Sequence, residues 1–346
     1  MAENSTWGRL RWPIKALIIA IPIIVIGYFA SESGILDGKA TKSAENKEST
    51  LPEPSSSSAA APKEKGSSSA KSSSNHRTFN YVPEKPVNPE IKGVVEVGAS
   101  GFNSFVVKID KDQHWEIVSK DFGKSFVYEG MATTEDIRKG LKDYIGAMFD
   151  KGVKSRNVHF VISSGAQKEP KTAVIAAELK KMGYLANLVT PELEGKYALK
   201  SVLPPAYYDN SFVVDIGSGN TKISWMENGS IKSLEGPGAK YYEKDMKDDA
   251  VYAAIKALAE KIPAAKREIC FIIGGVPFEM ANQIRDGEER FTVLNGPEEY
   301  KSDKAKVKAG VNIYKAIKDV TKCDTFVFDW DANFTIGYLL SLNNVK

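Results

Sequence analysis

Two glycine-rich turns of the same design constrain the fold of this chain more than any other feature of its sequence. The first follows Glu96 in the stretch 94–103, and the second follows Asp215 in the stretch 212–221. In both, the carboxylate lies at the end of a β-branched run, two residues before a glycine. Small residues let backbone N–H groups approach an anion, while hydroxyls and a carboxylate can hold phosphate and its metal. One such turn could simply join two strands, but the repetition indicates a duplicated unit with two opposed phosphate-binding hairpins.

The N-terminal part of the chain differs in composition from the rest. Residues 14–30 are almost unbroken apolar sequence, with Arg9 and Arg11 before them. Because this run is long enough to cross a bilayer and lacks a clear small-x-small cleavage site, we expect a short segment 1–13 and an uncleaved transmembrane anchor at 14–31. A cleaved signal peptide and a buried core helix are the alternatives. Residues 32–90 are rich in Ser, Ala, Lys and Pro with almost nothing to bury, which predicts a disordered linker.

Charges around the expected anchor bear on the side of the membrane that the rest of the chain occupies. Basic residues stand directly before the anchor, whereas Lys39 and Lys42 follow it at a distance and are mixed with acids. This pattern favours a cell-membrane protein with an extracytoplasmic globular part. The opposing argument is that Mg-nucleotides are plentiful in the cytoplasm, where free cysteines are also more usual, so both placements stay open.

Charge and reactive side chains exclude several classes of function. The net charge of +3 at pH 7 is small and spread along the chain, so no nucleic-acid surface is expected. Cys270 and Cys323 lie in or beside apolar runs and are expected to be buried thiols. His76, His114 and His159 are scattered singly, so no metal site or catalytic imidazole is expected from them.

From residue 91 onward the hydrophobic pattern is that of an α/β protein in two halves. Strands are expected at 94–97, 104–109, 115–119, 157–162, 185–189, 269–273 and 325–328, together with the second hairpin. Helices are expected at 134–150 after a Thr133 N-cap, at 171–182, 192–202, 250–262 and 304–320, and from 333 onward. Each half opens with a strand meander and then alternates, which predicts two lobes, 91–208 and 209–346.

The second hairpin and three other segments resemble one known family. Residues 213–221 are similar to the Val-Ile-Asp-Ile-Gly-Gly-Gly-Ser-Thr motif of the exopolyphosphatase and guanosine pentaphosphate phosphatase (Ppx/GppA) family. Residues 188–199 stand where that family has an Ile-Ser-Gly-x-Glu-Glu-Ala-Arg helix start, and residues 161–168 where it has an Ala-Thr-x-x-x-Arg loop. Residues 309–313 and 329–340 resemble its closing segments. The resemblance runs from about residue 93 to the C-terminus and implies a two-lobed actin-like (ribonuclease H-like) fold, shared with sugar kinases and chaperone ATPases.

The same resemblance implies roles for individual residues. Glu194 matches the family's catalytic glutamate, which deprotonates the attacking water, although a first-turn helix acid is the plainer interpretation. Asp215 and Glu96 would hold Mg²⁺, with a turn-stabilising role as the alternative for Asp215. Lys168 matches a phosphate-binding arginine, or else is a solvated surface lysine. The expected phosphate-binding residues are Ser100, Gly101, Asn103, Lys168, Gly217, Ser218, Gly219, Asn220, Thr221, Gly274 and Gly275.

Four positions of the expected site depart from the family pattern. Glu96 replaces an aspartate, and the extra methylene shifts the carboxylate, which matters for octahedral Mg²⁺. The turn at 99–104 matches the family spacing only if two residues are inserted. Lys222 stands where the family has a glutamate, and Pro191 replaces a glycine. A fold survives such changes more readily than catalysis does.

Three functions are therefore compatible with the sequence. The first is a membrane-tethered, Mg²⁺-dependent phosphohydrolase that removes the terminal phosphate of polyphosphate or a nucleotide polyphosphate. The second is an inactive phosphate or nucleotide sensor or scaffold that works with protein partners in a membrane complex. The third is an actin-like ATPase with an adenosine pocket around 274–277. The altered first hairpin and the long linker favour the second over the first.

Overall fold

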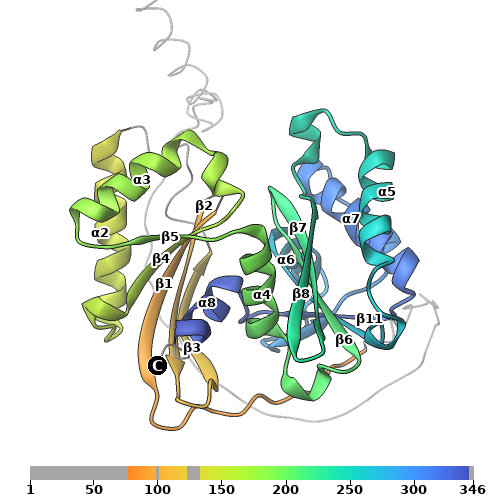
Figure 1. Cartoon of the computed structure of the whole chain (residues 1–346), viewed down its shortest axis with the longest axis horizontal. Coiled ribbons are helices and arrows are strands. Elements are labelled where there is room, and N and C mark those ends of the chain that lie inside the picture. Colours follow the sequence, from red (N-terminus) through yellow and green to blue (C-terminus); the bar gives the residue numbers. More distant parts are fainter. Residues whose placement is uncertain (1–76, 99–100, 123–132, 343–346) are drawn as a thin grey trace, which may run out of the picture. The chain divides into compact units, whose positions relative to one another are not determined.

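The computed structural model of the chain describes residues 77–98, 101–122 and 133–342 (Figure 1). The expected anchor at 14–31, most of the expected linker and Ser100 lie outside the described residues. Within these three ranges, no helix combines the length and the apolar character needed to cross a membrane.

The first of two β-sheets opens with an antiparallel meander and continues with parallel strands. Its strands are β1 (Glu90–Gly98), β2 (Gly101–Ile109), β3 (Trp115–Phe122), β4 (Val158–Ile162) and β5 (Ala186–Leu188), in the order β3-β2-β1-β4-β5. Strands β1, β2 and β3 pair antiparallel, whereas β4 pairs parallel with β1, and β5 with β4. The strand order therefore reverses at β1 and β4.

The second sheet repeats this topology and adds one edge strand. Its strands are β6 (Ser211–Ile216), β7 (Asn220–Glu227), β8 (Ser230–Pro237), β9 (Ile269–Ile273), β10 (Phe291–Val293) and β11 (Thr325–Asp329), in the order β10-β11-β9-β6-β7-β8. Strands β6, β7 and β8 form the meander, β9 and β11 continue it in parallel, and β10 adds antiparallel to β11. The repeated order confirms the duplicated α/β architecture that the two glycine-rich turns predicted.

Amphipathic helices cover the outer face of each sheet (Figure 1). Helices α2 (Thr134–Asp150) and α3 (Pro170–Lys181) pack on the first sheet, where Leu141 and Met148 share a buried cluster with Phe160 of β4. Thr133 forms a capping box that starts α2, as its place before the apolar periodicity predicted. Helices α5 (Asp248–Ala259), α6 (Gly275–Asn282) and α7 (Ala305–Thr321) belong to the second lobe.

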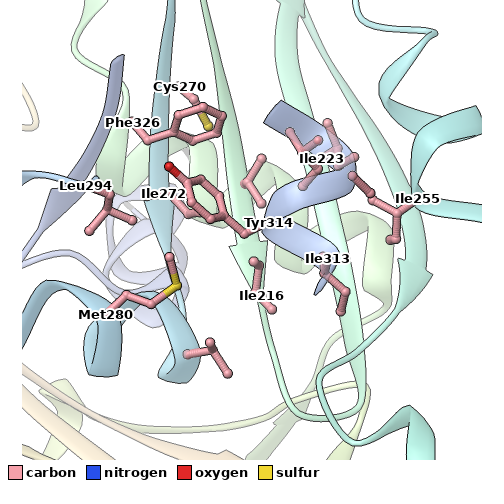
Figure 2. Close-up of a cluster of buried hydrophobic side chains, with 14 of the residues drawn as sticks. Ile216, Ile223, Ile255, Cys270, Ile272, Met280, Leu294, Ile313, Tyr314 and Phe326 are labelled. Atoms are coloured by element: carbon pink, nitrogen blue, oxygen red, sulfur yellow. The ribbon is translucent and has the colours of Figure 1, made fainter. Parts of the chain in front are cut away.

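The core of the second lobe is organised around Tyr314 of α7, which is completely buried (Figure 2). Its ring meets Phe326 of β11 edge-on with centroids 4.8 Å apart. Its hydroxyl donates a hydrogen bond to the backbone carbonyl of Asn295 at 2.8 Å, so the one polar atom of this side chain is satisfied. Cys270 lies in the same cluster, and both cysteines are buried free thiols, as predicted.

Two further helices fill the space between the inner faces of the sheets. Helices α4 (Pro191–Val202) and α8 (Phe334–Leu342) pack against each other and share one buried cluster with side chains of both sheets, including Phe105 and Phe271. Gly337 of α8 lies so close to α4 that a Cβ there would stand 1.8 Å from the carbonyl oxygen of Tyr197. The crossing of α4 and α8 thus fixes the starts of both helices, which belong to the site described below.

Residues 77–89, which the sequence assigned to the linker, lie against the globular part. The ring of Phe79 meets Phe271 and Phe291 at centroid distances of 5.5 and 5.4 Å. The backbone N–H of Val87 donates to the carboxylate of Asp110 at 3.0 Å. Contacts with the second sheet therefore begin upstream of the boundary expected at residue 91.

Candidate functional site

A cavity of about 340 Å³ lies where the turns after β1 and β6 approach each other. It stands at the carboxyl ends of the parallel strands and at the point where the strand order of each sheet reverses, which is where open α/β sheets bind ligands. The expected site residues on its wall are Glu96, Gly101, Asn103, Glu194, Asp215, Gly217, Ser218, Gly219, Asn220, Gly274 and Gly275.

Two expected site residues that the structure describes do not line this cavity. Lys168 is exposed in a short 3₁₀ turn and does not line the cavity, so its geometry agrees with a solvated surface lysine. Thr221 is completely buried and its hydroxyl donates to the carbonyl of Pro237 at 2.7 Å, which ties β7 to β8. Ser100 lies outside the described residues. The structure therefore gathers most of the expected residues and leaves Lys168 and Thr221 aside.

On the first hairpin, two amides hold the carboxylate of Glu96. Asn103 of β2 donates to its Oε2 at 2.8 Å, and Asn333, just before α8, donates to the same oxygen at 2.9 Å. Burial raises the pKa of Glu96 even though both donors favour the ionised form. Asn333 also accepts from the backbone N–H of Thr335 at 2.8 Å, so it caps α8 and positions Glu96 at once.

The turn of the second hairpin is shaped by close backbone contacts. Gly217 donates to the carbonyl of Asn220 at 3.0 Å, while its own carbonyl accepts from Ala239 at 2.9 Å. Gly274, which follows β9, has a φ of +110°, and a Cβ there would stand 2.4 Å from the carbonyl oxygen of Ile216. Only glycine fits this position, which brings the start of α6 beside the turn.

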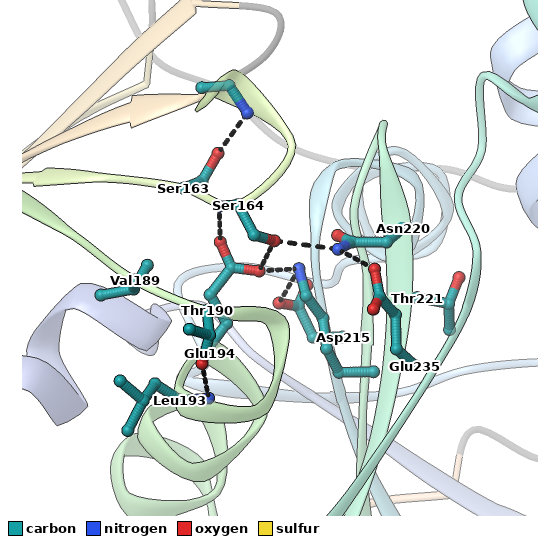
Figure 3. A network of polar contacts seen from close by, with 12 residues as sticks. Ser163, Ser164, Val189, Thr190, Leu193, Glu194, Asp215, Asn220, Thr221 and Glu235 are labelled. Atoms are coloured by element: carbon teal, nitrogen blue, oxygen red, sulfur yellow. Dashed lines mark hydrogen bonds and ion pairs between the residues drawn. The ribbon is translucent and has the colours of Figure 1, made fainter. Parts of the chain in front are cut away.

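Glu194 lies at the centre of a buried polar network that joins the two lobes (Figure 3). It sits in the first turn of α4, which Thr190 caps. Its Oε1 accepts from the backbone N–H of Ser164 at 2.6 Å, and its Oε2 accepts from the hydroxyl of Ser164 at 2.8 Å. The amide of Asn220 donates to that hydroxyl at 2.9 Å and to Glu235 at 2.8 Å. Both oxygens of Glu194 are therefore held by donors of the protein.

Lys222 of β7 completes this network with a buried ion pair. Its Nζ lies 2.5 Å from Oε2 of Glu194 and 3.7 Å from Oδ2 of Asp215, and its side chain is only 5% exposed. Burial opposes the charge of the ammonium, but Asp215 and Glu194 outweigh it and raise the pKa of Lys222. Burial raises the pKa of Asp215, although the positive charge of Lys222 lowers it.

The cavity wall also carries charged groups that were not among the expected catalytic, phosphate-binding or metal residues, among them Asp329 and Lys306. Asp329 ends β11 and is paired with Arg290 at 3.1 and 3.0 Å. Lys306 of α7 points toward the start of α6, with its Nζ 3.5 Å from where a Cβ of Gly275 would stand. Burial, and secondarily Lys240, lower the pKa of Lys306. Asp329 could have been found in the sequence, because it ends a β-branched and aromatic run as Asp215 does; no local signal marks Lys306.

One side of the cavity is aromatic. Phe122 of β3 and Phe278 of α6 meet with centroids 5.5 Å apart, and Phe278 meets Trp330 at 5.4 Å. These rings come from both lobes and leave an apolar surface beside the polar turns. The cavity therefore has one end built for charged groups and one able to stack a planar group.

Two sheets of repeated topology, with facing hairpins around a cavity, define the chain as an actin-like α/β protein. No family model and no curated protein matches its sequence. Solved structures with this fold include the Ppx/GppA phosphatase of Aquifex aeolicus, 16% identical, with a TM-score of 0.53 over 72% of this chain and 98% of that one. They also include an exopolyphosphatase from Cytophaga hutchinsonii, 14% identical, with a TM-score of 0.54 over 74% of this chain and 98% of that one.

The likeness to these structures shows that the chain has the Ppx/GppA type of actin-like fold. The resemblance stated from the sequence motifs is therefore confirmed at the level of the fold. At this identity the likeness carries no activity, and the roles of the site residues have to be argued from the cavity itself.

Proposed function

We propose that this chain binds the phosphate groups of polyphosphate or a nucleotide polyphosphate in the cavity between its hairpins, as a binding protein more than as a hydrolase. The observation that carries this proposal is the group of anion-binding features at one end of the cavity. They are the glycine turn at 217–219, the start of α6 at Gly275 and the ammonium of Lys306.

These features act together on one anion. Backbone N–H groups in a glycine-rich turn and at a helix start attract phosphate oxygens. Lys306 has no ion-pair partner within 77–98, 101–122 and 133–342, so its charge is available to a ligand. Its partial burial in the cavity wall strengthens that attraction, because water screens it less there.

Most acids of the cavity wall have a cation beside them, which lowers their repulsion of a phosphate. Arg290 pairs with Asp329, and Lys304 pairs with Glu279 at 3.1 Å. Lys222 is shared between the carboxylates of Glu194 and Asp215. Of the two lysines that line the cavity, Lys222 is held by these carboxylates, so Lys306 is the cation that we expect a phosphate at the turn of the second hairpin to meet.

Binding without turnover is favoured by the way in which Glu194 is held. A general base must orient a water molecule with a carboxylate oxygen. Both oxygens of Glu194 already accept from Ser164, and Lys222 occupies one of them. The carboxylate of Glu194 is also completely buried, so an attacking water could reach its remaining lone pairs only if neighbouring side chains moved.

Hydrolysis of a terminal phosphate is the second candidate function. It is favoured by the position of Glu194, which lines the same cavity as the glycine turn of the second hairpin. An actin-like ATPase is the third candidate, and the aromatic side formed by Phe122 and Phe278 is where a base could stack.

Calorimetric titration of the full chain with inorganic triphosphate, together with a phosphate-release assay, tests the proposal. We expect saturable binding that is weakened about tenfold or more in Lys306→Met and is unchanged in Lys308→Met, which alters an exposed lysine of the same helix. Phosphate release should not exceed background. Release that disappears in Glu194→Gln would establish the hydrolase instead, and the absence of binding would refute the proposal.

We also propose, from the sequence, that residues 14–31 anchor the chain in the cell membrane and that the segment after them links the anchor to an extracytoplasmic globular part. The support is the apolar run at 14–30 and the basic residues before it. Reporter fusions at residue 60 and at the C-terminus test this placement. Reporter activity on the cytoplasmic side would contradict it.

A further inference from the structure

The position of Lys222 is set by the register of the second hairpin. Strands β6 and β7 pair so that Lys222 stands directly opposite Asp215, and directly opposite residues of an antiparallel pair project from the same face. Glu194 reaches the same point from α4. The ammonium of Lys222 is thus inserted between two carboxylates that come from different parts of the fold.

We infer that Lys222 takes the place of a divalent cation in this site, so that the ligand binds without Mg²⁺. The inference rests on the proposed function only in taking the ligand to be a phosphate. It assigns to this chain a metal-independent site, in contrast to the Mg²⁺ site expected from the sequence.

The residues expected to hold Mg²⁺ do not fit that ion. Mg²⁺ needs oxygen ligands in near-ideal octahedral geometry. Oδ2 of Asp215 lies against Lys222, and Oε2 of Glu96 accepts from both Asn103 and Asn333. Across the part of the chain that the structure describes, no group of three or more His, Cys, Asp or Glu side chains could hold a metal ion.

Electrostatics makes the ammonium and a divalent ion alternatives. The carboxylate of Glu194 is completely buried, and the side chains of Asp215 and Lys222 are 9% and 5% exposed. A cation added beside them would be repelled by the ammonium with little screening from water. The pairing of β7 with β6 and β8 fixes the backbone of Lys222, and burial and the two carboxylates hold its ammonium in place.

Removing the ammonium should therefore create a metal site. Lys222→Gln leaves Asp215 and Glu194 as two buried carboxylates without a cation, which is the number that Mg²⁺ and Mn²⁺ use together with phosphate or water. Lys232→Gln is the matched control, because Lys232 pairs with Glu227 on the exposed side of the same sheet, with the two side chains 55% and 38% exposed.

The experiment uses the full chain and two probes, Mn²⁺ alone and inorganic triphosphate. We expect the wild type to bind triphosphate with the same affinity, within about twofold, in EDTA and in Mg²⁺, and to show no Mn²⁺ binding by paramagnetic resonance. Lys222→Gln should gain Mn²⁺ affinity by about tenfold or more, and Asp215→Asn in that background should abolish the gain. Lys232→Gln should behave like the wild type.

Three results would overturn the inference about Lys222, and a fourth would refute only the proposed function. Triphosphate binding by the wild type that needs Mg²⁺, Mn²⁺ binding by the wild type that Asp215→Asn removes, or a folded Lys222→Gln without gained Mn²⁺ affinity would each refute it. If Lys222→Gln does not fold, the two wild-type measurements decide. If the wild type binds triphosphate in neither buffer, the proposed function is refuted. The Mn²⁺ measurements then decide by themselves whether Lys222 takes the place of a divalent cation.

Discussion

Replacing Gly337 by alanine should destabilise the chain because α4 and α8 touch through their backbones at this point. A Cβ at Gly337 would stand 1.8 Å from the carbonyl oxygen of Tyr197 and 2.5 Å from its carbonyl carbon. Carbon–oxygen contacts normally begin at about 3.3 Å, so the helices would have to separate by about 1.5 Å. The obstacle is backbone, so no flexible side chain can turn away to make room.

The size of the effect follows from two opposing terms. Overpacking of this kind costs about 1–3 kcal/mol, and the upper end applies because both helices are clamped between two sheets. Alanine in place of glycine in a helix stabilises the folded state by about 0.5–1 kcal/mol. The net loss is about 2 kcal/mol, which for a folded part of this size lowers Tm by about 4–8 °C.

Thermal unfolding of the full chain, followed by circular dichroism, measures this shift. The matched control is Gly146→Ala in α2, where a Cβ would meet nothing within 4 Å, so the same substitution should raise Tm by about 1–4 °C. Opposite signs for the two variants are the expected result. If Gly337→Ala melts at or above the wild type, the close crossing of α4 and α8 is wrong.

Three further predictions concern stability. Arg290→Met should cost about 3–5 kcal/mol in denaturant unfolding, because it leaves the carboxylate of Asp329, 1% exposed, without its partner; a loss below about 1 kcal/mol would contradict this. Asp110→Asn should make the free energy of unfolding depend less on pH in the acid range. Burial opposes ionisation of Asp110, but a backbone N–H and His114 lower its pKa to about 2, so the folded state gains stability above about pH 4 and loses it as the pH falls through about 2. An unchanged slope of unfolding midpoint against pH would refute that role. Thr133→Ala should cost about 1 kcal/mol through the lost cap of α2 while Thr133→Ser keeps most of it, and equal melting of the two variants would speak against the capping box.

Local signals in the sequence predicted much of the fold. The apolar spacing after Thr133 predicted the helix at 134–150, and the structure has α2 at Thr134–Asp150. Gly183, expected to end the preceding helix, has a φ of +84° just after α3. The two glycine turns predicted the duplicated meander because a carboxylate before a tight turn marks the same point of each repeat.

Elements with weak local signals were missed. Helix α6 begins at Gly275 in a Gly-Gly-Val-Pro stretch that is typical of a turn, and it becomes a helix because Gly274 packs on Ile216. Strand β10, Phe291–Val293, is three residues long and is stabilised by its pairing with β11 and by the burial of its side chains. In both cases tertiary contacts decide what the local sequence leaves open.

In the candidate site, too, residues with a local sequence signal were predicted, and residues placed by tertiary contacts were missed. The carboxylates of Glu96 and Asp215 were predicted from the turn motif and that of Glu194 from the family resemblance, and the structure places all three on one cavity. The partners that occupy them come from distant segments, as Asn333 does for Glu96. The sequence marked Lys222 only as a departure from a family pattern, since nothing local shows that α4 brings Glu194 within 2.5 Å of it.

A crystal structure of the full chain soaked with inorganic triphosphate in EDTA would show whether the cavity binds phosphate without a metal ion. We expect phosphate density against the backbone of 217–219 and the ammonium of Lys306, with Lys222 still located between Glu194 and Asp215. A metal-free cavity without density at saturating triphosphate, or triphosphate bound only elsewhere on the surface, would contradict this expectation.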